Sequence, residues 1–439
     1  MNLLPMPDYA SRQSDIEEIV NTIIEIKRRF FSLDETNIEY HGLLAQFDTL
    51  HTIGLALERL QQDLTASNME YLELVKQNDD LWMDLADIAP DSDFRHTLNN
   101  YKSLRSYEEL ISIDGATSQN VLDRSVMAQE IVQELVGMAF GRWDIAYAQH
   151  KKPLPEFGDV FDALPFMPEV SLKNPAADYP VKIPADGILS NDPNSTLCLA
   201  ARVREVIHLI WGHERADDIE YELCGLIGCN TLQAYLENPN GFFAYHFKRY
   251  TKSRRKAPIY WPVSSSEGSI TYWVYYPKLS HNTLPALVLK LRHEQTAERN
   301  AINAALAAHD RVAENDHRER LLQVEDMMHR LEELNNCGYK PNHDDGVPVT
   351  AAPLAAFFQL RAWRQECEQN LEKLDQGEFD WSHLAMALYR ARVTAKCKKD
   401  WCLALTHGLE AICENKPAER RTRRRSAPEA TQTNIDFND

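Results

Sequence analysis

One stretch of the chain decides both how its centre folds and where it carries charge: residues 241–279 read GFFAYHFKRYTKSRRKAPIYWPVSSSEGSITYWVYYPKL. A basic run without an acidic residue passes there into two aromatic segments, 259–263 and 270–276. Both segments alternate in the strand period, and the serine-rich insert between them contains a glycine, which is typical of a β-hairpin. The alternation places Trp261 on one face of the first strand and Tyr260 on the other.

Most of the remaining sequence has helical periodicity, so the predicted fold class is mainly α with a small β component (α+β). Ser14 and Glu17 form a capping-box pattern, and an amphipathic helix is expected to begin there. Further helices are expected at 43–64, 69–86, 122–140, 197–211, 219–226, 381–389 and 392–413. Residues 284–334 predict one or two long helices that form a spacer or a helical hairpin.

Three other segments are expected to lack helix. Four prolines between residues 153 and 168 predict an extended connector. Residues 346–352 are turn-like and extended in pattern, and disorder is expected beyond Asn415.

A chain of 439 residues exceeds the usual size of one hydrophobic core, so several packed units are expected. The predicted units are an acidic helical unit at 1–110, a helix with a Pro-rich connector at 111–195, a basic and aromatic DNA-recognition unit at 196–283, a long helical spacer or hairpin at 284–340, a C-terminal mixed or helical unit at 341–415, and a disordered basic tail at 416–439.

Charge is distributed unevenly along the chain. The formal net charge is −19, and residues 1–110 supply −12 of it from 21 acidic and 9 basic residues. A polyanion is therefore expected to bind elsewhere. Cations gather in the basic run, at Lys248, Arg249, Lys252, Arg254, Arg255 and Lys256. A second cluster lies in the polar tail, at Arg420, Arg421, Arg423, Arg424 and Arg425.

Cations beside aromatic rings suit a nucleic acid, because each Lys or Arg on a phosphate releases a counterion while rings stack on or wedge between bases. We predict that the six cations of the basic run hold phosphates of double-stranded DNA, which gives a log–log salt slope of roughly −5. Four rings, Tyr260, Trp261, Trp273 and Tyr275, are expected to lie near the duplex or to brace the hairpin. For the two tryptophans, hairpin core is the favoured interpretation. The alternative for the basic run is a solvated turn before a buried hairpin.

No sequence pattern assigns a catalytic, cofactor-binding or metal-binding residue. The phosphate-cradling GxxxxGK[ST], the GxSxG elbow and the Asn-Pro-Pro-aromatic turn of base methyltransferases do not occur in the sequence. Eight cysteines, spaced unlike those of zinc ribbons, are expected to be reduced core residues. A sequence without a long apolar run or a leader pattern predicts a cytoplasmic protein with no membrane partner.

Four blocks of sequence occur in a fixed order between residues 120 and 412. They are VGMAFGRWDI at 136–145 with FDALPFMP after it; IPADGIL at 183–189 with RVREV at 202–206 and IWG at 210–212; KSRRKAPIYWP at 252–262 with 272–279; and DDGV at 344–347 through FDWSH at 379–383 and CKKD at 397–400 to LALTHGLE at 403–410. Together they resemble the C-terminal region of large adenine-specific DNA methyltransferases of type IIG restriction-modification systems and of the BREX and DISARM phage-defence systems.

This resemblance implies a target-recognition role. In such proteins the catalytic domain lies N-terminal to this region, whereas here the sequence begins inside the family pattern. S-adenosylmethionine is therefore expected in a catalytic partner chain or a missing domain, with no cofactor in this chain, whether the chain is a split subunit or a gene fragment. It is not expected to be catalytic alone. Two alternatives stay open: a noncatalytic assembly protein of a defence complex, and an enzyme with a divergent nuclease or methyltransferase site.

Overall fold

The computed structural model of the chain describes residues 9–47, 52–87, 111–113, 120–159, 162–163, 167–252 and 255–416. Helix makes up 63% and strand 6% of it, which confirms a mainly α fold with a small β component. One continuous cluster of buried apolar side chains runs from Ile26 to Cys413. Because this core passes through the five predicted units between residues 1 and 415, their boundaries stay a prediction.

A three-stranded antiparallel sheet lies at the centre, in the order β3-β7-β6. Its strands are β3 (Ile188–Ser190), β6 (Tyr260–Ser264) and β7 (Thr271–Tyr275). The predicted hairpin is confirmed as β6 and β7, with Tyr260 opposite Tyr275. The third strand, β3, was not expected from the sequence, and it pairs with the free side of β7.

Helices cover both faces of this sheet, so all residues of its strands are buried. One face packs on α4 (Arg124–Phe140) and α9 (Phe242–Arg249), where Phe140 stacks on Tyr260 with ring centroids 5.2 Å apart. The other face carries Trp261, whose ring meets Phe358 at 6.3 Å. The alternation therefore distributes side chains between two buried layers rather than between core and solvent.

Two N-terminal helices form an antiparallel arm, α1 (Gln13–Phe31) and α2 (Ile53–Leu85). The capping-box prediction at Ser14 is wrong, because a 3₁₀ turn (Ala10–Arg12) precedes the helix and Ser14 lies inside it. The two helices predicted at 43–64 and 69–86 are also corrected. Residues Leu44–Gln46 form a separate 3₁₀ turn, and the rest is one helix of 33 residues.

The elements in the middle of the chain are a small hairpin, β1 (Ile111–Ile113) with β2 (Asn120–Leu122), then α4, α5 (Ile145–Ala148), α6 (Leu199–Trp211), α7 (His213–Ile227) and α8 (Leu232–Glu237). The three helices predicted at 122–140, 197–211 and 219–226 are present as α4, α6 and α7, whereas β1, β2, α5 and α8 were not predicted. Helix α4 ends at Gly141, whose φ of +76° suits glycine. Residues 153–159 contain neither helix nor strand, as expected for the Pro-rich connector.

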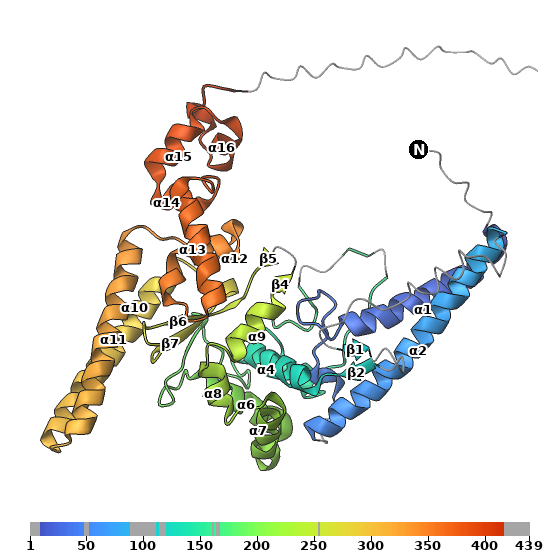
Figure 1. Ribbon diagram of the computed structural model, residues 1–439, viewed down its shortest axis with the longest axis horizontal. Coiled ribbons are helices and arrows are strands. Elements are labelled where there is room, and N and C mark those ends of the chain that lie inside the picture. The colour runs from blue at the N-terminus through green and yellow to red at the C-terminus, as the bar shows by residue number, and fades with distance from the viewer. Residues whose placement is uncertain are drawn as a thin grey trace, which may run out of the picture.

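The predicted spacer is a helical hairpin made of α10 (Thr283–Ala307) and α11 (Arg311–Asn336). Asp310 caps α11 by accepting hydrogen bonds from Val312 and Ala313. Ion pairs then cross between the two helices, with Arg299 to Glu325 at 2.9 Å as one example. Figure 1 shows the distal half of this hairpin projecting from the body.

The C-terminal part is a stack of short helices. After a 3₁₀ turn (His343–Asp345) come α12 (Val347–Ala351), a second 3₁₀ segment (Ala352–Phe357), α13 (Arg361–Gln376), α14 (His383–Leu388), α15 (Arg390–Cys397), α16 (Trp401–Thr406) and a last turn (Glu410–Ile412).

Three predictions for this part are corrected. Residues 347–351 are helical rather than extended, since Pro348 sits in the first turn, where proline is tolerated. The helix predicted at 392–413 is divided, because Asp400 caps a new helix by accepting from Leu403, and Gly408 has a φ of +65°. The helix predicted at 381–389 begins later, at His383, with Ser382 as its cap.

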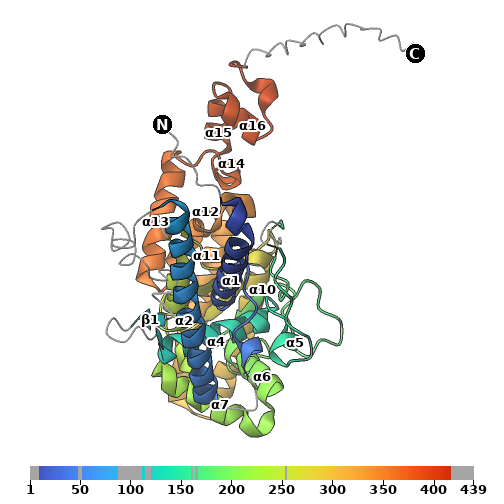
Figure 2. The same cartoon turned by 90° about the vertical axis from the view of Figure 1, so that its right-hand side faces the viewer.

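Figures 1 and 2 show the C-terminal helices α14–α16 standing away from the sheet. In the space-filling view the same helices form a separate column beyond the body. Across the described residues, every helix is too short or too polar to cross a membrane.

Candidate functional site

The basic run forms a small hairpin between α9 and the central sheet. Strand β4 (Thr251–Lys252) pairs with β5 (Arg255–Lys256), Thr251 opposite Lys256. The Thr251 hydroxyl donates to the Phe247 carbonyl at 2.7 Å and anchors the start of the hairpin on α9. In Figure 1 both strands lie at the edge of the body that faces the space between the α1–α2 arm and the C-terminal helices.

Two of the six predicted phosphate ligands are occupied by carboxylates, which corrects their assignment. Arg249 is buried, and its guanidinium pairs with Asp34 at 2.9 Å and with Glu130. The Lys256 ammonium pairs with Glu366 of α13. A buried, doubly paired guanidinium cannot reach a phosphate without breaking the core, and Lys256 would have to leave its partner.

The other four cations differ in what the structure describes of them. Lys248 and Arg255 are exposed, and neither has an ion pair with another described residue. Lys252 lies in β4, and Arg254 lies outside the described residues. The basic run therefore retains at most four cations for a phosphate backbone.

All four predicted rings belong to the core. Tyr260, Trp261, Trp273 and Tyr275 are buried. The indole of Trp261 donates to the Pro258 carbonyl at 2.8 Å, so its polar atom is satisfied inside the protein. In this conformation none of these rings presents a face to a base, and the bracing role is the one that their burial supports.

A cluster of six charged side chains, all buried except the partly buried Arg142, includes Arg249 at the end of α9, just before the hairpin. Its members are Asp34 and Glu35 after α1, Glu130 and Glu134 on α4, Arg142 after α4, and Arg249 on α9. Arg142 pairs with Glu35 at 2.7 Å, and Tyr250 donates to the same carboxylate at 2.6 Å. The cluster joins segments more than 200 residues apart in sequence, as in the contact of Arg249 with Asp34.

Four carboxyl groups against two guanidinium groups leave this cluster short of positive charge. Burial raises the pKa of Glu130 to about 7, although Arg249 opposes the shift. Burial likewise raises the pKa of Glu134 to about 7, against hydrogen bonds from Leu44 and Tyr40. Protonation of such groups near neutral pH is how a protein avoids uncompensated buried charge.

His246 connects the cluster to the sheet as a neutral side chain. Its Nε2 accepts from the backbone N–H groups of Ile259 at 2.9 Å and Tyr260 at 3.3 Å. Because backbone N–H groups only donate, this nitrogen is unprotonated, and Nδ1 is left to donate to the Gln133 amide oxygen at 3.1 Å. Burial and nearby Arg142 lower the His246 pKa far below its usual value.

Sequence reasoning did not find this cluster. Glu130, Gln133 and Glu134 have the i, i+3, i+4 spacing of one helix stripe, a pattern that ordinarily indicates the solvated side of a helix. The available signal was their position inside an otherwise apolar helix. That signal cannot reveal that Asp34 and Arg249 approach from distant parts of the chain.

The histidines and cysteines lie in separate small groups. Nδ1 of His208 and Nδ1 of His213 are 2.6 Å apart, and the cysteines are unpaired thiols, most of them buried. In the described ranges no group of three or more His, Cys, Asp or Glu side chains is arranged to hold a metal ion.

Comparison with known proteins gives no relative: no protein-family model matches the chain, and no curated protein matches it. The resemblance of the four sequence blocks to DNA methyltransferases therefore remains a hypothesis, together with the partner chain and the cofactor that it implies.

Proposed function

We propose that the chain binds double-stranded DNA as the recognition portion or subunit of an adenine-specific methyltransferase of a phage-defence or restriction-modification system, with methyl transfer carried by another chain or domain. The supporting observation is the β4–β5 hairpin. Arg255 on β5 and Lys248 near the end of α9, just before the hairpin, are exposed and have no carboxylate partner among the described residues, in a protein whose net charge is −19. Unpaired cations on such a protein are where a phosphate backbone would bind.

The C-terminal helices carry further cations of the same kind. Arg390, Lys398 and Lys399 are exposed on and after α15, and none forms an ion pair with a described residue. By contrast, Arg392 and Lys396 of the same helix pair with Asp380. The Lys256–Glu366 ion pair attaches the β4–β5 hairpin to α13, the helix that precedes α14 and α15 in the chain. The cations of the basic run and those of α15 are therefore linked through α13.

The polar tail leaves from this same region. The Glu414 N–H donates to the Lys398 carbonyl at 2.8 Å, and the Asn415 amide donates to the Lys399 carbonyl at 2.8 Å. The next basic residues after Lys416 in the sequence are the arginine cluster of the tail, which lies outside the described residues and would add its charge to that of the exposed lysines.

Salt dependence of DNA binding tests the proposal. With at most four cations available to phosphates, the basic run alone gives a log–log slope of about −4 instead of roughly −5. We expect Lys248→Ala with Arg255→Ala to reduce the slope by about 2 in fluorescence anisotropy on a labelled duplex. The charge-matched control is Lys151→Ala with Lys173→Ala, which changes exposed lysines near the Pro-rich connector. Binding without salt dependence, or equal loss in both double variants, would refute the assignment.

An assembly protein is the second candidate, and the α10–α11 hairpin favours it. Apolar side chains are exposed along this projecting element, Val312 at 72% and Leu322 at 67%. A protein that used this hairpin to bind a partner would lose that partner on Val312→Glu with Leu322→Glu, and would keep it on Lys248→Ala with Arg255→Ala. DNA binding is supported instead if Lys248→Ala with Arg255→Ala weakens duplex binding in fluorescence anisotropy, while Val312→Glu with Leu322→Glu leaves the proteins captured in pull-downs from the native host unchanged.

A further inference from the structure

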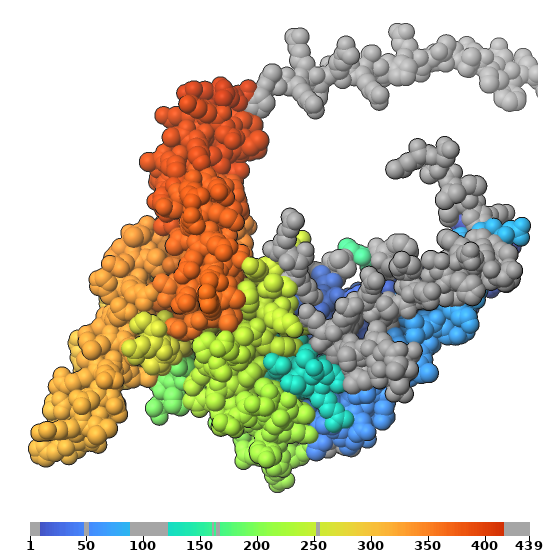
Figure 3. Space-filling model, in the orientation of Figure 1, coloured from blue at the N-terminus to red at the C-terminus, as the bar shows by residue number. Residues whose placement is uncertain are grey.

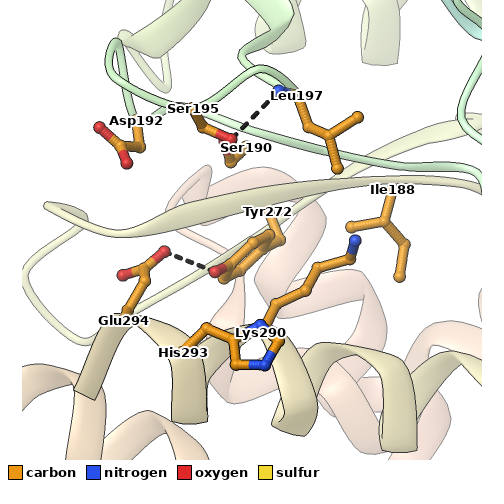
Figure 4. A pocket seen from close by; sticks show the side chains of 9 residues that line it. All are labelled: Ile188, Ser190, Asp192, Ser195, Leu197, Tyr272, Lys290, His293 and Glu294. Carbon is orange, nitrogen blue, oxygen red and sulfur yellow. Dashed lines mark hydrogen bonds between the residues drawn. The ribbon is translucent and has the colours of Figure 1, made fainter. Parts of the chain in front are cut away.

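A cavity of about 230 Å³ opens between the outer edge of the sheet and the first half of α10. It is lined by Ile188, Ser190, Asp192, Ser195, Leu197, Tyr272, Lys290, His293 and Glu294. Figure 4 shows Ser190 and Asp192 on one side, the α10 side chains on the other, and Tyr272 between them. At about 30 Å³ per water, this volume matches about eight waters or a small organic molecule.

One end of the cavity is acidic and incompletely satisfied. The Tyr272 hydroxyl donates to Oε1 of Glu294 at 2.5 Å, but Oε2 is buried and accepts no hydrogen bond from a described residue. The nearest cation is Arg320, 3.7 Å from that oxygen and held more closely by Glu298 at 2.9 Å. Asp192 uses one oxygen to accept from the Asn194 N–H at 2.9 Å, and has no ion pair among the described side chains.

Ser190 supplies a second, independent observation. Its side chain is only 5% exposed, it lines the cavity, and its hydroxyl has no hydrogen-bond partner in the described part of the chain. The residue lies opposite Tyr272 in the sheet, which places both side chains on the cavity side. A buried hydroxyl left without a partner is costly, so a bound group that hydrogen-bonds to it is favoured.

The basic end of the cavity is already neutralised. The Lys290 ammonium pairs with Asp186 at 2.9 Å. Among the side chains that line the cavity, the carboxylates are Asp192 and Glu294, and the one lysine, Lys290, is already paired with Asp186. Burial raises the pKa of Glu294, and the negative charge of Asp192 adds to that shift. The site therefore lacks positive charge and hydrogen-bond donors rather than negative charge.

We propose that this cavity binds a small aliphatic amine through its primary ammonium group. The ammonium donates to Oε2 of Glu294 and to the Ser190 hydroxyl, while Asp192 supplies a second negative charge. The methylene groups lie along Ile188 and Leu197, and the Tyr272 ring forms the wall between the two ends. Three donors on one compact cation match the acceptors that the protein leaves without partners.

Calorimetric titration of the full chain with putrescine, without DNA, tests this site. We expect saturable binding of one molecule per chain, and no binding of 1,4-butanediol, which has the same length without charge. Glu294→Gln should weaken putrescine at least about tenfold, since it removes a charge-assisted hydrogen bond while its oxygen still accepts from Tyr272. Ser190→Ala should weaken it about two- to tenfold.

Glu319→Gln is the matched control, because it removes the same charge from an exposed side chain of α11 that has no ion pair with a described residue. It should leave putrescine affinity unchanged, and thermal unfolding should show that all three variants are folded. If Glu319→Gln weakened putrescine binding as much as Glu294→Gln does, the binding would be non-specific electrostatic attraction. Tighter binding of butyrate or of inorganic phosphate than of putrescine, or no binding of putrescine, would overturn the proposal.

Discussion

At the scale of single residues, Gly137 shows how closely the core around α4 is packed. A methyl group added there would lie 2.4 Å from Cδ1 and 2.7 Å from Nε1 of the Trp143 indole. The Tyr260 hydroxyl would be 3.2 Å away. Because the indole and the phenol are both buried, neither has free space to move into. Glycine at this position therefore allows two rings to contact the helix backbone.

We expect Gly137→Ala to destabilise the protein by about 1–3 kcal/mol, since an added methyl group in a filled core forces neighbours out of their rotamers. Gly225→Ala is the control, because that glycine also lies inside a helix, α7, with nothing within 4 Å of an added Cβ. There alanine should stabilise by about 0.5–1 kcal/mol. Urea unfolding measures both, and equal effects at the two sites would contradict the packing seen around Trp143.

Glu134 is the residue at which the buried charge should be most easily measured. Its folded pKa of about 7 lies above the ordinary 4.5, so the folded state holds a proton that the unfolded state releases between those values. Stability from this group is present below pH 4.5 and is lost as pH rises through 7. We therefore expect the effect of Glu134→Gln on the free energy of unfolding to be more favourable at pH 8 than at pH 4.5 by about 1–3 kcal/mol.

The glutamine in this variant still accepts the Leu44 N–H, which the native carboxylate accepts at 3.0 Å. Glu25→Gln, on the exposed side of α1, is the control for removing one negative charge. Urea midpoints at the two pH values separate the two variants. A Glu134→Gln effect that is the same at both pH values would mean that the native carboxyl does not change its protonation state between them.

At the scale of elements, the sequence predicted what local periodicity determines. The β6–β7 hairpin was expected because its alternation and its turn are visible within a few residues, and the α10–α11 pair because no proline follows Pro285 in that segment. Strand β3 was missed because three residues carry too little pattern, and it becomes a strand by pairing with β7. The buried carboxylates of α4 were missed because their partners lie far away in the chain.

Helix α2 gives a direct test of one correction, since the sequence suggested two helices divided near residues 65–68. Ala66 is exposed in the middle of the single helix that the structure contains. Ala66→Pro should cost about 3 kcal/mol there, because proline removes a backbone hydrogen bond and clashes with the preceding turn. Ala66→Ser, the control, should cost under about 1 kcal/mol. A tolerated proline, judged by urea unfolding, would restore the division into two helices.

At the scale of the whole molecule, two neighbouring cations have opposite environments. Arg249 holds the N-terminal arm to the body, because its buried guanidinium bridges Asp34 after α1 and Glu130 on α4. Lys248, one residue earlier on the same helix, is exposed. Sequence alone places both in one basic run. The packing of α9 separates them, since adjacent residues of a helix point in directions about 100° apart.

This separation predicts that stability and DNA binding respond to different residues. Arg249→Met should cost about 3–5 kcal/mol, because it leaves two buried carboxyl groups without their cation. Lys248→Met should change stability by under about 0.5 kcal/mol and weaken duplex binding, with a salt slope smaller by about 1. Urea unfolding and fluorescence anisotropy on the same two variants measure both quantities. The opposite result would be an Arg249→Met variant as stable as the native protein that loses DNA affinity as Lys248→Met does. The cations of the basic run would then all face the duplex, and the buried cluster would not hold the N-terminal arm.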